Sequence, residues 1–332
     1  MTPLKKLMQH HNLNHDEMAE LTQIMFNPEI DDSEKVAYLV ALKMKEETTL
    51  ELTSLVKEII KRQYPVQPQL KDSICVCGTG GDHSGSFNIS TTVSFIIAAA
   101  GLKVLKHGNK SITSKTGSVD ILEALNIRTT PFHAVEENLK KSNLQFLSAT
   151  ETYPDMKLIQ QVRKRIPVPT VFNLAGPLIH PYQLEYQVMG VYDGTKAKAI
   201  AETLFNLGRK RAIVVHGAGG MDEATLSGEN MIYEVERTHG ITHYTISAEQ
   251  FGLQTAENSA LKGDDKYLNA DITKNILKGI EQGPKRDVVL LNAGLALYIS
   301  NTTPNIQQGI ERARYLIDSG AAYKILTGKA EG

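Results

Sequence analysis

The chain has 332 residues, a formal net charge of −1 at pH 7 and an ordinary globular composition in which 41% of the residues are hydrophobic. This length suits two domains, or one large domain with a smaller satellite. The near-zero charge argues against a nucleic-acid-binding protein, because such a protein needs an excess of Lys and Arg to neutralise phosphates. We therefore expect no nucleic-acid partner.

Signals for secretion and for membrane insertion are also missing. The first residues, MTPLKKLMQHH, contain no apolar signal core. The longest apolar run, Val93 to Leu102, is about half as long as a membrane span. Cys75 and Cys77 have an i, i+2 spacing on a predicted strand, which fits neither a disulfide nor a metal site. We expect a cytoplasmic protein with no membrane partner and with both thiols reduced in the core.

Residues 1–62 are predicted to be helical. Thr2 before Pro3 has the pattern of a helix start, and residues 52–60 have the i, i+3, i+4 apolar spacing of an amphipathic helix. Capping-box spacing occurs in Asn14 with Glu17 and in Thr48 with Glu51. Lys61–Asp72 contains two prolines and few apolar residues, so we interpret it as a linker. The predicted domains are therefore a helical domain, 1–71, and an α/β domain, 72–332.

After the linker, strands alternate with helices and glycine-bearing loops. The predicted strands are 73–77, 103–106, 211–216 and 287–292, and the predicted helices are 91–100, 121–125, 196–207, 293–300 and 306–318. A strand–loop–helix–strand–loop order implies parallel βαβ units whose loops meet at one edge of the sheet, where ligands of such sheets bind. The predicted fold class is α/β, with a small all-helical N-terminal domain and a mainly parallel central sheet.

The loop after the first strand is the most informative segment. It reads GTGGD from Gly78 and NIST from Asn88. The sixth position of a dinucleotide fingerprint is His83, and Gly81 to Ser90 contains no lysine for a Walker loop. Glycines and hydroxyl groups before a helix leave backbone N–H groups free to bind an anion. The segment therefore favours a phosphate site over a plain turn, with Asp82 suited to a cation or a sugar hydroxyl.

A second loop, KHGNKSITS at 106–114, has lysines and hydroxyl groups around a glycine. Ser118 and Asp120 are predicted to cap the helix at 121–125. A solvated loop is the alternative interpretation, but its place at the same sheet edge as the first loop favours a site. His107 has no paired carboxylate in the sequence, so we expect it to be a structural hydrogen-bonding residue and not a general base.

Two further groups of charged residues each allow two interpretations. Asp222 and Glu223 follow a strand and a glycine loop, which suits Mg²⁺, although both also suit the first turn of a helix. Arg163 lies in the basic turn VRKR, which suits either a carboxylate ligand or a solvated surface.

The motifs GTGGD, SFNIST, KHGN, GSVD, FNLAGPL and HGAGGMDEATLSG, in this order, resemble those of the anthranilate phosphoribosyltransferase family. The resemblance covers nearly the whole chain, including the helical segment DDSEKVAYLVALKMKEET. It implies transfer of the phosphoribosyl group of 5-phosphoribosyl 1-pyrophosphate to the amine of anthranilate in tryptophan biosynthesis, with Mg²⁺. It also implies a homodimer formed through the helical domain, and a segment near 161–181 that returns to that domain.

The resemblance further implies which residues form the site. No catalytic acid or base is expected, because the amine of anthranilate is already nucleophilic at neutral pH. The anthranilate contacts are Gly78, Asn109 and Arg163, and the metal ligands are Ser90, Asp222 and Glu223. The residues expected at the phosphoribosyl pyrophosphate are Gly78, Gly81, Asp82, Ser86, Asn88, Ile89, Ser90, Thr91, Lys106, His107, Gly108, Asn109, Lys110, Ser111, Ile112, Thr113, Ser114 and Ser118.

The chain departs from the family pattern at two positions near the expected acceptor route. Tyr153-Pro154 stands where the family commonly has His-Pro, and Pro169 stands where many members have Arg. Two other functions remain as alternatives: a pyrimidine-nucleoside phosphorylase, which resembles this architecture, and a nucleic-acid-binding branch of the same fold. The long GTGGD and SFNIST motifs argue against the first, and the near-zero charge with the intact MDE motif argues against the second.

Overall fold

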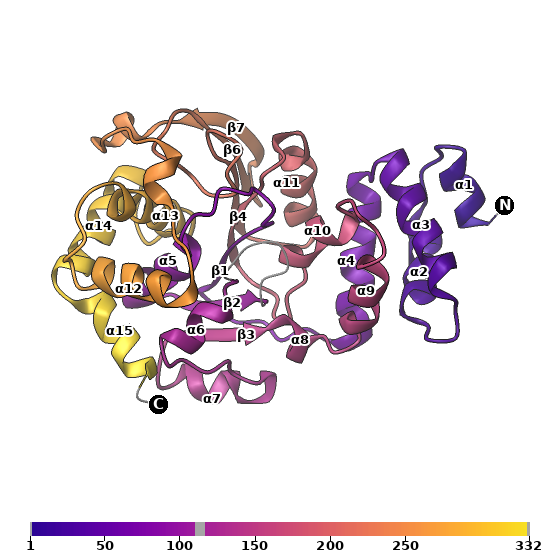
Figure 1. Ribbon diagram of the computed structural model, residues 1–332, viewed down its shortest axis with the longest axis horizontal. Coiled ribbons are helices and arrows are strands. Elements are labelled where there is room, and N and C mark those ends of the chain that lie inside the picture. Colours follow the sequence, from indigo (N-terminus) through magenta and orange to yellow (C-terminus); the bar gives the residue numbers. More distant parts are fainter. Residues whose placement is uncertain (1, 110–116, 331–332) are drawn as a thin grey trace.

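The computed structural model describes residues 2–109 and 117–330. A smaller helical lobe carries the N-terminus, and a larger α/β lobe lies beside it along the long axis of the molecule (Figure 1). The predicted fold class is confirmed: a small N-terminal helical domain precedes a large α/β domain with a mostly parallel sheet. None of the helices in the two described ranges is long and apolar enough to cross a membrane.

The helical lobe is built on the predicted helix starts. Thr2 caps the first helix, and both capping boxes form. Glu51 is fully buried and accepts hydrogen bonds from the N–H of Leu13 at 2.8 Å and from Lys45 Nζ at 2.7 Å. One carboxylate thus joins the start of α4 to the α1–α2 loop and to the end of α3. The helices are α1 Pro3–Met8, α2 His15–Phe26, α3 Asp32–Lys45 and α4 Thr49–Gln63.

Three short helices from the middle of the chain lie near this lobe: α8 Ala149–Thr152, α9 Met156–Arg163 and α10 Val171–Ala175. Helix α9 packs against α2 and α3, and α10 packs against α3 and α4. Parts of the segment around residues 161–181 therefore contact the N-terminal helices. The exact domain boundaries at residues 71 and 72 stay a prediction.

A seven-stranded sheet, in the order β3-β2-β1-β4-β5-β6-β7, forms the centre of the α/β lobe. Strands β3, β2, β1, β4 and β5 are parallel, whereas β6 is antiparallel to β5 and β7 is antiparallel to β6. The strands are β1 Ser73–Gly78, β2 Lys103–Gly108, β3 Leu144–Ser148, β4 Tyr186–Gly190, β5 Arg211–His216, β6 Asn230–Glu236 and β7 Gly240–Ile246.

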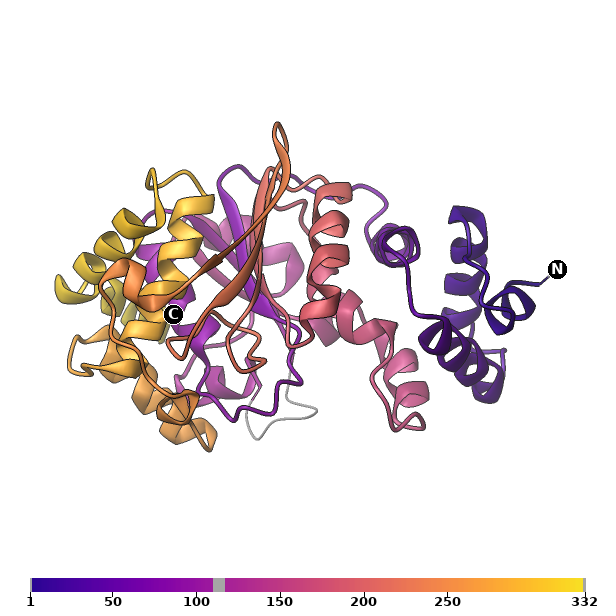
Figure 2. The same ribbon diagram turned by 90° about the horizontal axis from the view of Figure 1, so that it is seen from above.

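Both faces of the sheet are covered, so alternate strand residues enter two different cores. Ile74 and Val76 belong to the core shared with α5 and the C-terminal helices, whereas Cys75 and Cys77 belong to the core shared with α11 and the helical lobe. Figure 2 shows helices on both sides of the sheet from above. Both thiols are buried and free, which confirms their prediction. The remaining helices are α5 Ile89–Ala99, α6 Asp120–Ala124, α7 Val135–Leu139, α11 Ala197–Asn206, α12 Lys266–Leu277, α13 Pro284–Ile299, α14 Ile306–Asp318 and α15 Ala321–Ala330. The 3-10 turns are η1 Phe132–Ala134, η2 Gly176–Leu178, η3 Gly194–Lys196, η4 Ala248–Phe251 and η5 Asn258–Leu261.

The predicted strand at 287–292 is wrong, because these residues lie inside the long helix α13. A short apolar run is compatible with a buried strand or with a buried helix, and its periodicity does not separate the two. Pro284 at the first helical position was the available signal for a helix start. Helix α13 is buried on nearly all sides between α5 and α14, which explains why it lacks an amphipathic pattern.

A closed chain of aromatic contacts lies where the two lobes meet. It begins at Tyr64, which follows α4 and contacts Phe132 with a centroid distance of 4.5 Å and Tyr153 at 5.3 Å. The chain closes through Tyr182 and His180, which precede β4, and through His107 near the end of β2. In order, the rings are Tyr64, Phe132, Tyr182, His180, His107 and Tyr153. This aromatic chain joins the helical lobe to the end of β2, where one of the predicted site loops begins.

Candidate active site

Loops that are far apart in the sequence meet at one edge of the sheet, because β1, β2, β4 and β5 are parallel and end there. Gly78 at the end of β1 is the register partner of Gly190 at the end of β4, and Gly190 is also paired with Val215 of β5. The glycine loop after β1, the loop after β2 and the acidic loop after β5 therefore occupy the same edge. The sequence predicted this for the first two loops.

The Asp222–Glu223 dipeptide lies directly over the strand ends, in a space that glycines leave open. A Cβ atom at Gly78 or at Gly190 would overlap Asp222, and a Cβ atom at Gly217 would overlap the Glu223 carbonyl. Any side chain at these three positions would push the acidic loop away from the sheet. The glycines thus set how deeply both carboxylates are placed.

Two fully buried asparagines hold this acidic loop, and the sequence analysis missed both. Asn292 of α13 accepts a hydrogen bond from the N–H of Ala224 at 3.1 Å and donates to the Ala224 carbonyl at 2.8 Å. Asn230 of β6 accepts one from the N–H of Thr225 at 2.7 Å. The only signal for Asn292 was a single amide within an apolar run. The loop leads into β6 and not into a helix, so the alternative that Asp222 caps a helix is wrong.

A buried lysine connects the two predicted site loops. Lys106 of β2 is 3% exposed, and its Nζ donates to the Val76 carbonyl at 2.7 Å and to Ser90 Oγ at 3.0 Å. Ser90 lies in the first turn of α5, and its backbone N–H donates to the Glu223 carboxylate. One ammonium group therefore joins β1, β2 and the start of α5 next to the acidic loop.

The carboxylates at this edge carry more negative charge than the surrounding groups balance. Burial, together with the charge of Asp82, raises the pKa of Asp222 to about 7. Burial and the charge of Asp222 raise the pKa of Glu223 to about 8, against the lowering effect of Lys106. Asp222 Oδ2 accepts a hydrogen bond from the N–H of Gly80 at 2.7 Å, whereas Asp82 Oδ2 is buried without a hydrogen-bond partner.

These carboxylates fit a divalent cation that other ligands help to hold. Among residues 2–109 and 117–330, no three His, Cys, Asp or Glu side chains are arranged to enclose a metal ion. Mg²⁺ typically takes one or two protein carboxylates and completes its six ligands with water and phosphate oxygens. Asp222, Glu223 and the unpartnered oxygen of Asp82 suit that mode of binding, in which a phosphorylated ligand brings the remaining oxygens.

The other expected donor residues of the first loop differ in what they offer to a ligand. Ile89 and Thr91 are buried, and the N–H of Ile89 donates to the Phe87 carbonyl at 2.7 Å, so neither the Ile89 side chain nor its N–H is open to a ligand. The Oγ1 atom of Thr91 has no hydrogen-bond partner. Asn88 precedes the helix, and its Oδ1 accepts from Asn269 Nδ2 at 3.1 Å. The N–H of Ser86 donates to Ser84 Oγ at 3.2 Å.

The second loop is described only in part, since Lys110, Ser111, Ile112, Thr113 and Ser114 lie outside the described residues. Gly108 ends β2 and lies against Ser118, whose Oγ donates to the Asn109 carbonyl at 3.4 Å.

The predicted cap of α6 is wrong. Val119 precedes the helix, and Asp120 is its first residue. The Asp120 carboxylate accepts from the N–H of Gly117 at 2.8 Å and so closes a turn before the helix.

His107 contacts the aromatic chain and the end of α8. Its Nε2 shares a hydrogen bond with Thr152 Oγ1 at 2.7 Å, and burial lowers its pKa to about 4. The imidazole is therefore neutral at physiological pH and is engaged with the protein. These contacts support a structural role over a general base.

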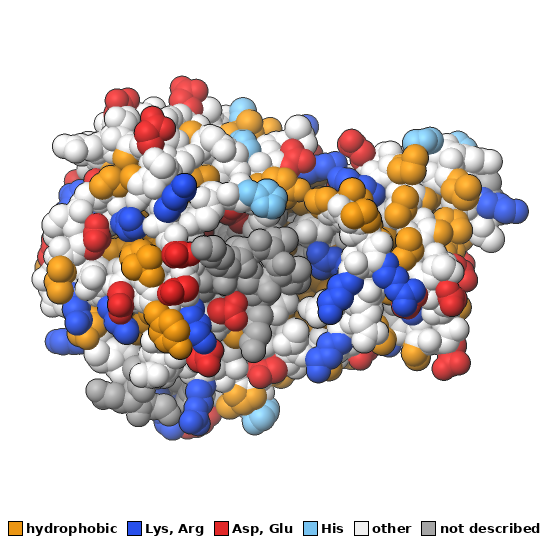
Figure 3. Space-filling model, viewed as in Figure 1, with side chains coloured by type: hydrophobic (Ala, Val, Ile, Leu, Met, Phe, Trp, Pro, Cys, Tyr) orange, Lys and Arg blue, Asp and Glu red, His pale blue; other side chains and the backbone are white. Residues whose placement is uncertain are grey.

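The expected acceptor contacts come from both sides of the junction between the lobes. Arg163 ends α9, and its Nη2 donates to Asn173 Oδ1 at 3.0 Å. Burial lowers the pKa of this guanidinium. Gly78 and Asn109, in contrast, follow strands of the sheet. Figure 3 shows Lys and Arg side chains gathered where the helical lobe faces the α/β lobe, which suits an anionic ligand.

Tyr192 is a second group that the sequence analysis missed. A Cβ at Gly81 would lie 3.5 Å from its ring, and its backbone N–H donates to Thr79 Oγ1 at 3.3 Å. The same β4–α11 loop leads to Lys196, whose Nζ forms an ion pair with Glu47 at 3.2 Å. This loop therefore connects the glycine loop to the helical lobe. The available signal was a glycine that ends an apolar strand, in QVMGVYDG.

Comparisons with known proteins agree with this division of the chain. Residues 70–323 match the a/b domain of the glycosyl transferase family, and residues 3–62 match its helical bundle domain. The chain is 50% identical over 324 residues to the anthranilate phosphoribosyltransferase of Staphylococcus carnosus, covering 98% of this chain and 96% of that protein. It is 51% identical to that of Staphylococcus epidermidis, covering 98% of both.

Solved structures of anthranilate phosphoribosyltransferases are also similar to this chain. The crystal structure of anthranilate phosphoribosyltransferase from Thermus thermophilus is 34% identical, with a TM-score of 0.90, and covers 100% of this chain and 99% of that one. The enzyme from Saccharomyces cerevisiae in complex with PRPP and Mg is 24% identical, with a TM-score of 0.86, and shares the fold. It covers 96% of this chain and 91% of that one.

The raised pKa values of Asp222 and Glu223 predict a pH-dependent stability in the absence of metal. The folded protein keeps protons that the unfolded chain releases above pH ~4, so stability falls as the pH rises towards about 8 and then levels off. The double variant Asp222→Asn/Glu223→Gln has no carboxyl group at either position. Its free energy of unfolding should therefore fall less as the pH rises, by an amount on the order of several kcal/mol. Urea unfolding in EDTA at pH 5 and pH 8.5, followed by far-UV circular dichroism, measures the difference. Glu29→Gln, an exposed change, is the control, and an unchanged pH slope in the double variant would contradict the assignment.

Proposed function

This chain belongs to the anthranilate phosphoribosyltransferase family, and we propose that it performs the family's reaction at the sheet edge formed by the ends of β1, β2, β4 and β5. The reaction transfers the phosphoribosyl group of 5-phosphoribosyl 1-pyrophosphate to the amine of anthranilate, giving N-(5-phosphoribosyl)anthranilate and pyrophosphate in tryptophan biosynthesis. The observation that carries the location is the acidic dipeptide seated on glycines, next to Lys106 and the start of α5.

We propose that the pyrophosphate end of the donor binds between the glycine loop and the first turn of α5. The glycine loop leads to the first turn of α5, which lies next to the two carboxylates, and helix N-termini favour anions. Bound Mg²⁺ would neutralise the leaving pyrophosphate, held by Asp222, Glu223 and Ser90. Lys106 holds Ser90 in place through its hydroxyl group. The residues from Lys106 to Ser114, with Ser118, are proposed for the phosphoribosyl end.

We propose that anthranilate binds between the lobes, with its carboxylate towards Arg163 and its amine towards the sheet edge near Gly78 and Asn109. The Arg163 side chain is partly buried and has an amide partner, Asn173, instead of a carboxylate. Its charge therefore stays available to an anionic ligand. Pro169 is exposed, whereas Tyr153 is buried in the aromatic chain. Tyr153 thus shapes this region by packing.

The chemistry needs positioning more than proton transfer. As pyrophosphate leaves, the ribose ring develops positive charge, and the amine attacks C1 from the opposite face with inversion. The neutral His107 is tied to Thr152, which agrees with a reaction that uses no dedicated base. The protein's part is to hold donor and acceptor in line and to keep water from the sugar cation.

We also propose a homodimer formed through the helical domain. Met8 and Met44 are 69% and 70% exposed, and they lie on α1 and α3, which contact each other. Methionine side chains are over-represented at adaptable binding surfaces.

The proposed activity predicts that anthranilate fluorescence decays only when protein, phosphoribosyl pyrophosphate and Mg²⁺ are all present. Asp222→Asn should raise the Mg²⁺ concentration needed for half-maximal rate, because it removes one charged ligand. A fluorescence assay across a Mg²⁺ titration measures both effects. An identical titration curve for the variant would refute the metal assignment, and no decay with any combination would refute the activity.

Arg163→Ala should raise the KM for anthranilate while leaving the KM for the donor unchanged. Loss of a charge-assisted carboxylate contact corresponds to roughly a 10- to 150-fold change. Arg165→Ala is the matched control, since Arg165 is exposed and pairs with Asp32 on the helical lobe. Steady-state kinetics with each substrate varied separately gives both constants. If both KM values rose together, Arg163 would be a structural residue.

Met44→Glu should convert the protein to a monomer, because it places a charge in the proposed dimer interface. Light scattering should give twice the 36.6 kDa chain mass for the parent and a single chain mass for the variant. Val66→Glu changes another exposed apolar residue, 85% exposed in the linker, and should remain dimeric. A monomeric parent protein would rule the proposal out.

A further inference from the structure

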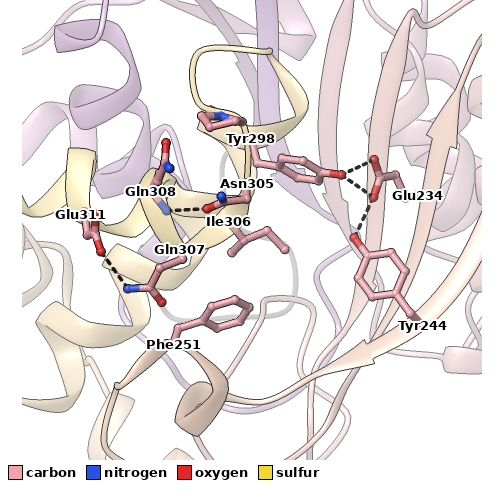
Figure 4. Close-up of a pocket in the computed structure, with 10 residues that line it drawn as sticks. Glu234, Tyr244, Phe251, Tyr298, Asn305, Ile306, Gln307, Gln308 and Glu311 are labelled. Carbon is pink, nitrogen blue, oxygen red and sulfur yellow. Dashed lines mark hydrogen bonds between the residues drawn. The ribbon is translucent and has the colours of Figure 1, made fainter.

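A second hollow lies away from the proposed active site, between the antiparallel end of the sheet and the C-terminal helices. Its volume is about 630 Å³, which is in the range of small-molecule sites. Figure 4 shows three aromatic side chains around it, each from a different element: Tyr244 from β7, Tyr298 from α13 and Phe251 from η4. Each of these rings is only partly buried, although it packs against the core. Three partly exposed rings therefore border the same hollow.

The polar groups of two of these rings are already used. Glu234 is 8% exposed, and it accepts hydrogen bonds from the hydroxyl of Tyr244 at 2.8 Å and from that of Tyr298 at 3.1 Å. It also forms an ion pair with Arg211 at 2.6 Å. Both hydroxyl groups point towards Glu234 (Figure 4). A ligand in the hollow would therefore contact the tyrosine rings and not their hydroxyl donors.

The charged residues around the hollow indicate the sign of the charge on a suitable ligand. None of the described residues that line it is a Lys, Arg or His. Arg211 lines a smaller adjoining cavity, where it pairs with Glu234 and lies 4.6 Å from the centre of the Tyr298 ring. The Glu311 carboxylate accepts one hydrogen bond, from Gln307 Nε2 at 3.1 Å, and has no ion pair within the described ranges. Glu311 therefore places a negative charge on the rim of the hollow, across from Glu234 and the two tyrosines (Figure 4).

The start of α14 also faces this hollow, and a helix N-terminus by itself favours anions. Here the Asn305 side chain accepts the N–H of Gln308 at 2.9 Å, so the protein supplies the cap. The formal charge of Glu311 is larger than the partial charge of a helix end. Aromatic faces also attract cations and not anions.

We propose that this hollow binds a small organic cation: a primary or quaternary amine on an apolar or aromatic body. The body would fill the space between Phe251, Ile306 and the two tyrosine rings. The ammonium group would lie at the Glu311 side of the hollow, next to the Phe251 ring. The proposal does not depend on the reaction at the other edge of the sheet.

The test uses two probes of nearly equal size, 2-phenylethylamine and 2-phenylethanol, titrated into the full-length protein by saturation-transfer NMR. The amine, charged at pH 7, should bind saturably with a Kd on the order of 1 mM, as expected for a fragment-sized ligand. The alcohol should bind at least several-fold more weakly, because it lacks the cation–π and ion-pair terms. Equal binding of the two probes, or no saturation by the amine, would overturn the proposal.

Variants locate the bound amine. Phe251→Leu keeps an apolar side chain but removes a ring, and Glu311→Gln removes the charge; each should weaken binding roughly two- to five-fold. Tyr315→Leu and Glu257→Gln are matched controls on exposed residues outside the hollow, and they should bind the amine as the parent does. Unchanged binding in both hollow variants would overturn the proposal. So would binding of 3-phenylpropionate that is tighter than that of the amine and is lost in Phe251→Leu, since the helix end would then select an anion.

Discussion

The seating of two carboxylates on the ends of parallel strands is the constraint on which the rest of the site depends. Asp222 and Glu223 reach this depth only because Gly78, Gly190 and Gly217 lack side chains. Their burial is unfavourable as long as they are charged, which the raised pKa values express. The fold compensates in part through the Gly80 N–H, the Ser90 N–H and the nearby Lys106. The negative charge that is left uncompensated favours the binding of a cation.

Hydrogen bonds hold the backbone around the carboxylates in place. Two buried asparagines from different elements hold the backbone that follows the carboxylates, and a buried lysine fixes the start of α5 against β1 and β2. In the proposed function, a cation and a phosphorylated ligand would complete an arrangement whose protein part is already in place. Such preorganisation lowers the cost of binding and aligns the leaving group before the reaction begins.

The two lobes are connected by more than a linker. One hydrophobic core includes side chains from α2, α3 and α4 together with Cys75, Leu105 and Met189 of the sheet. The aromatic chain that runs from Tyr64 to His107 links the last N-terminal helix to the end of β2. Lys196, with Glu46 and Glu47, links the loop after β4 to the helical lobe. Both connections end next to a site loop, so the packing of the helical lobe and the position of the donor loops are mechanically joined.

Local features of this protein were determined by the sequence alone: the capped helices, the linker, the parallel pairing of β1 with β2 and the loops that carry the site motifs. These depend on contacts between residues close in the chain, or on the rule that parallel strands end at one edge. Only the tertiary structure decided that the 287–292 run is helical, because a fully buried segment has no face that periodicity reveals. Only the tertiary structure brought Asn230, Asn292 and Tyr192 to the site and closed the six-ring aromatic chain. Their partners lie on other elements, and a contact between residues far apart in the chain exists only once those elements have packed.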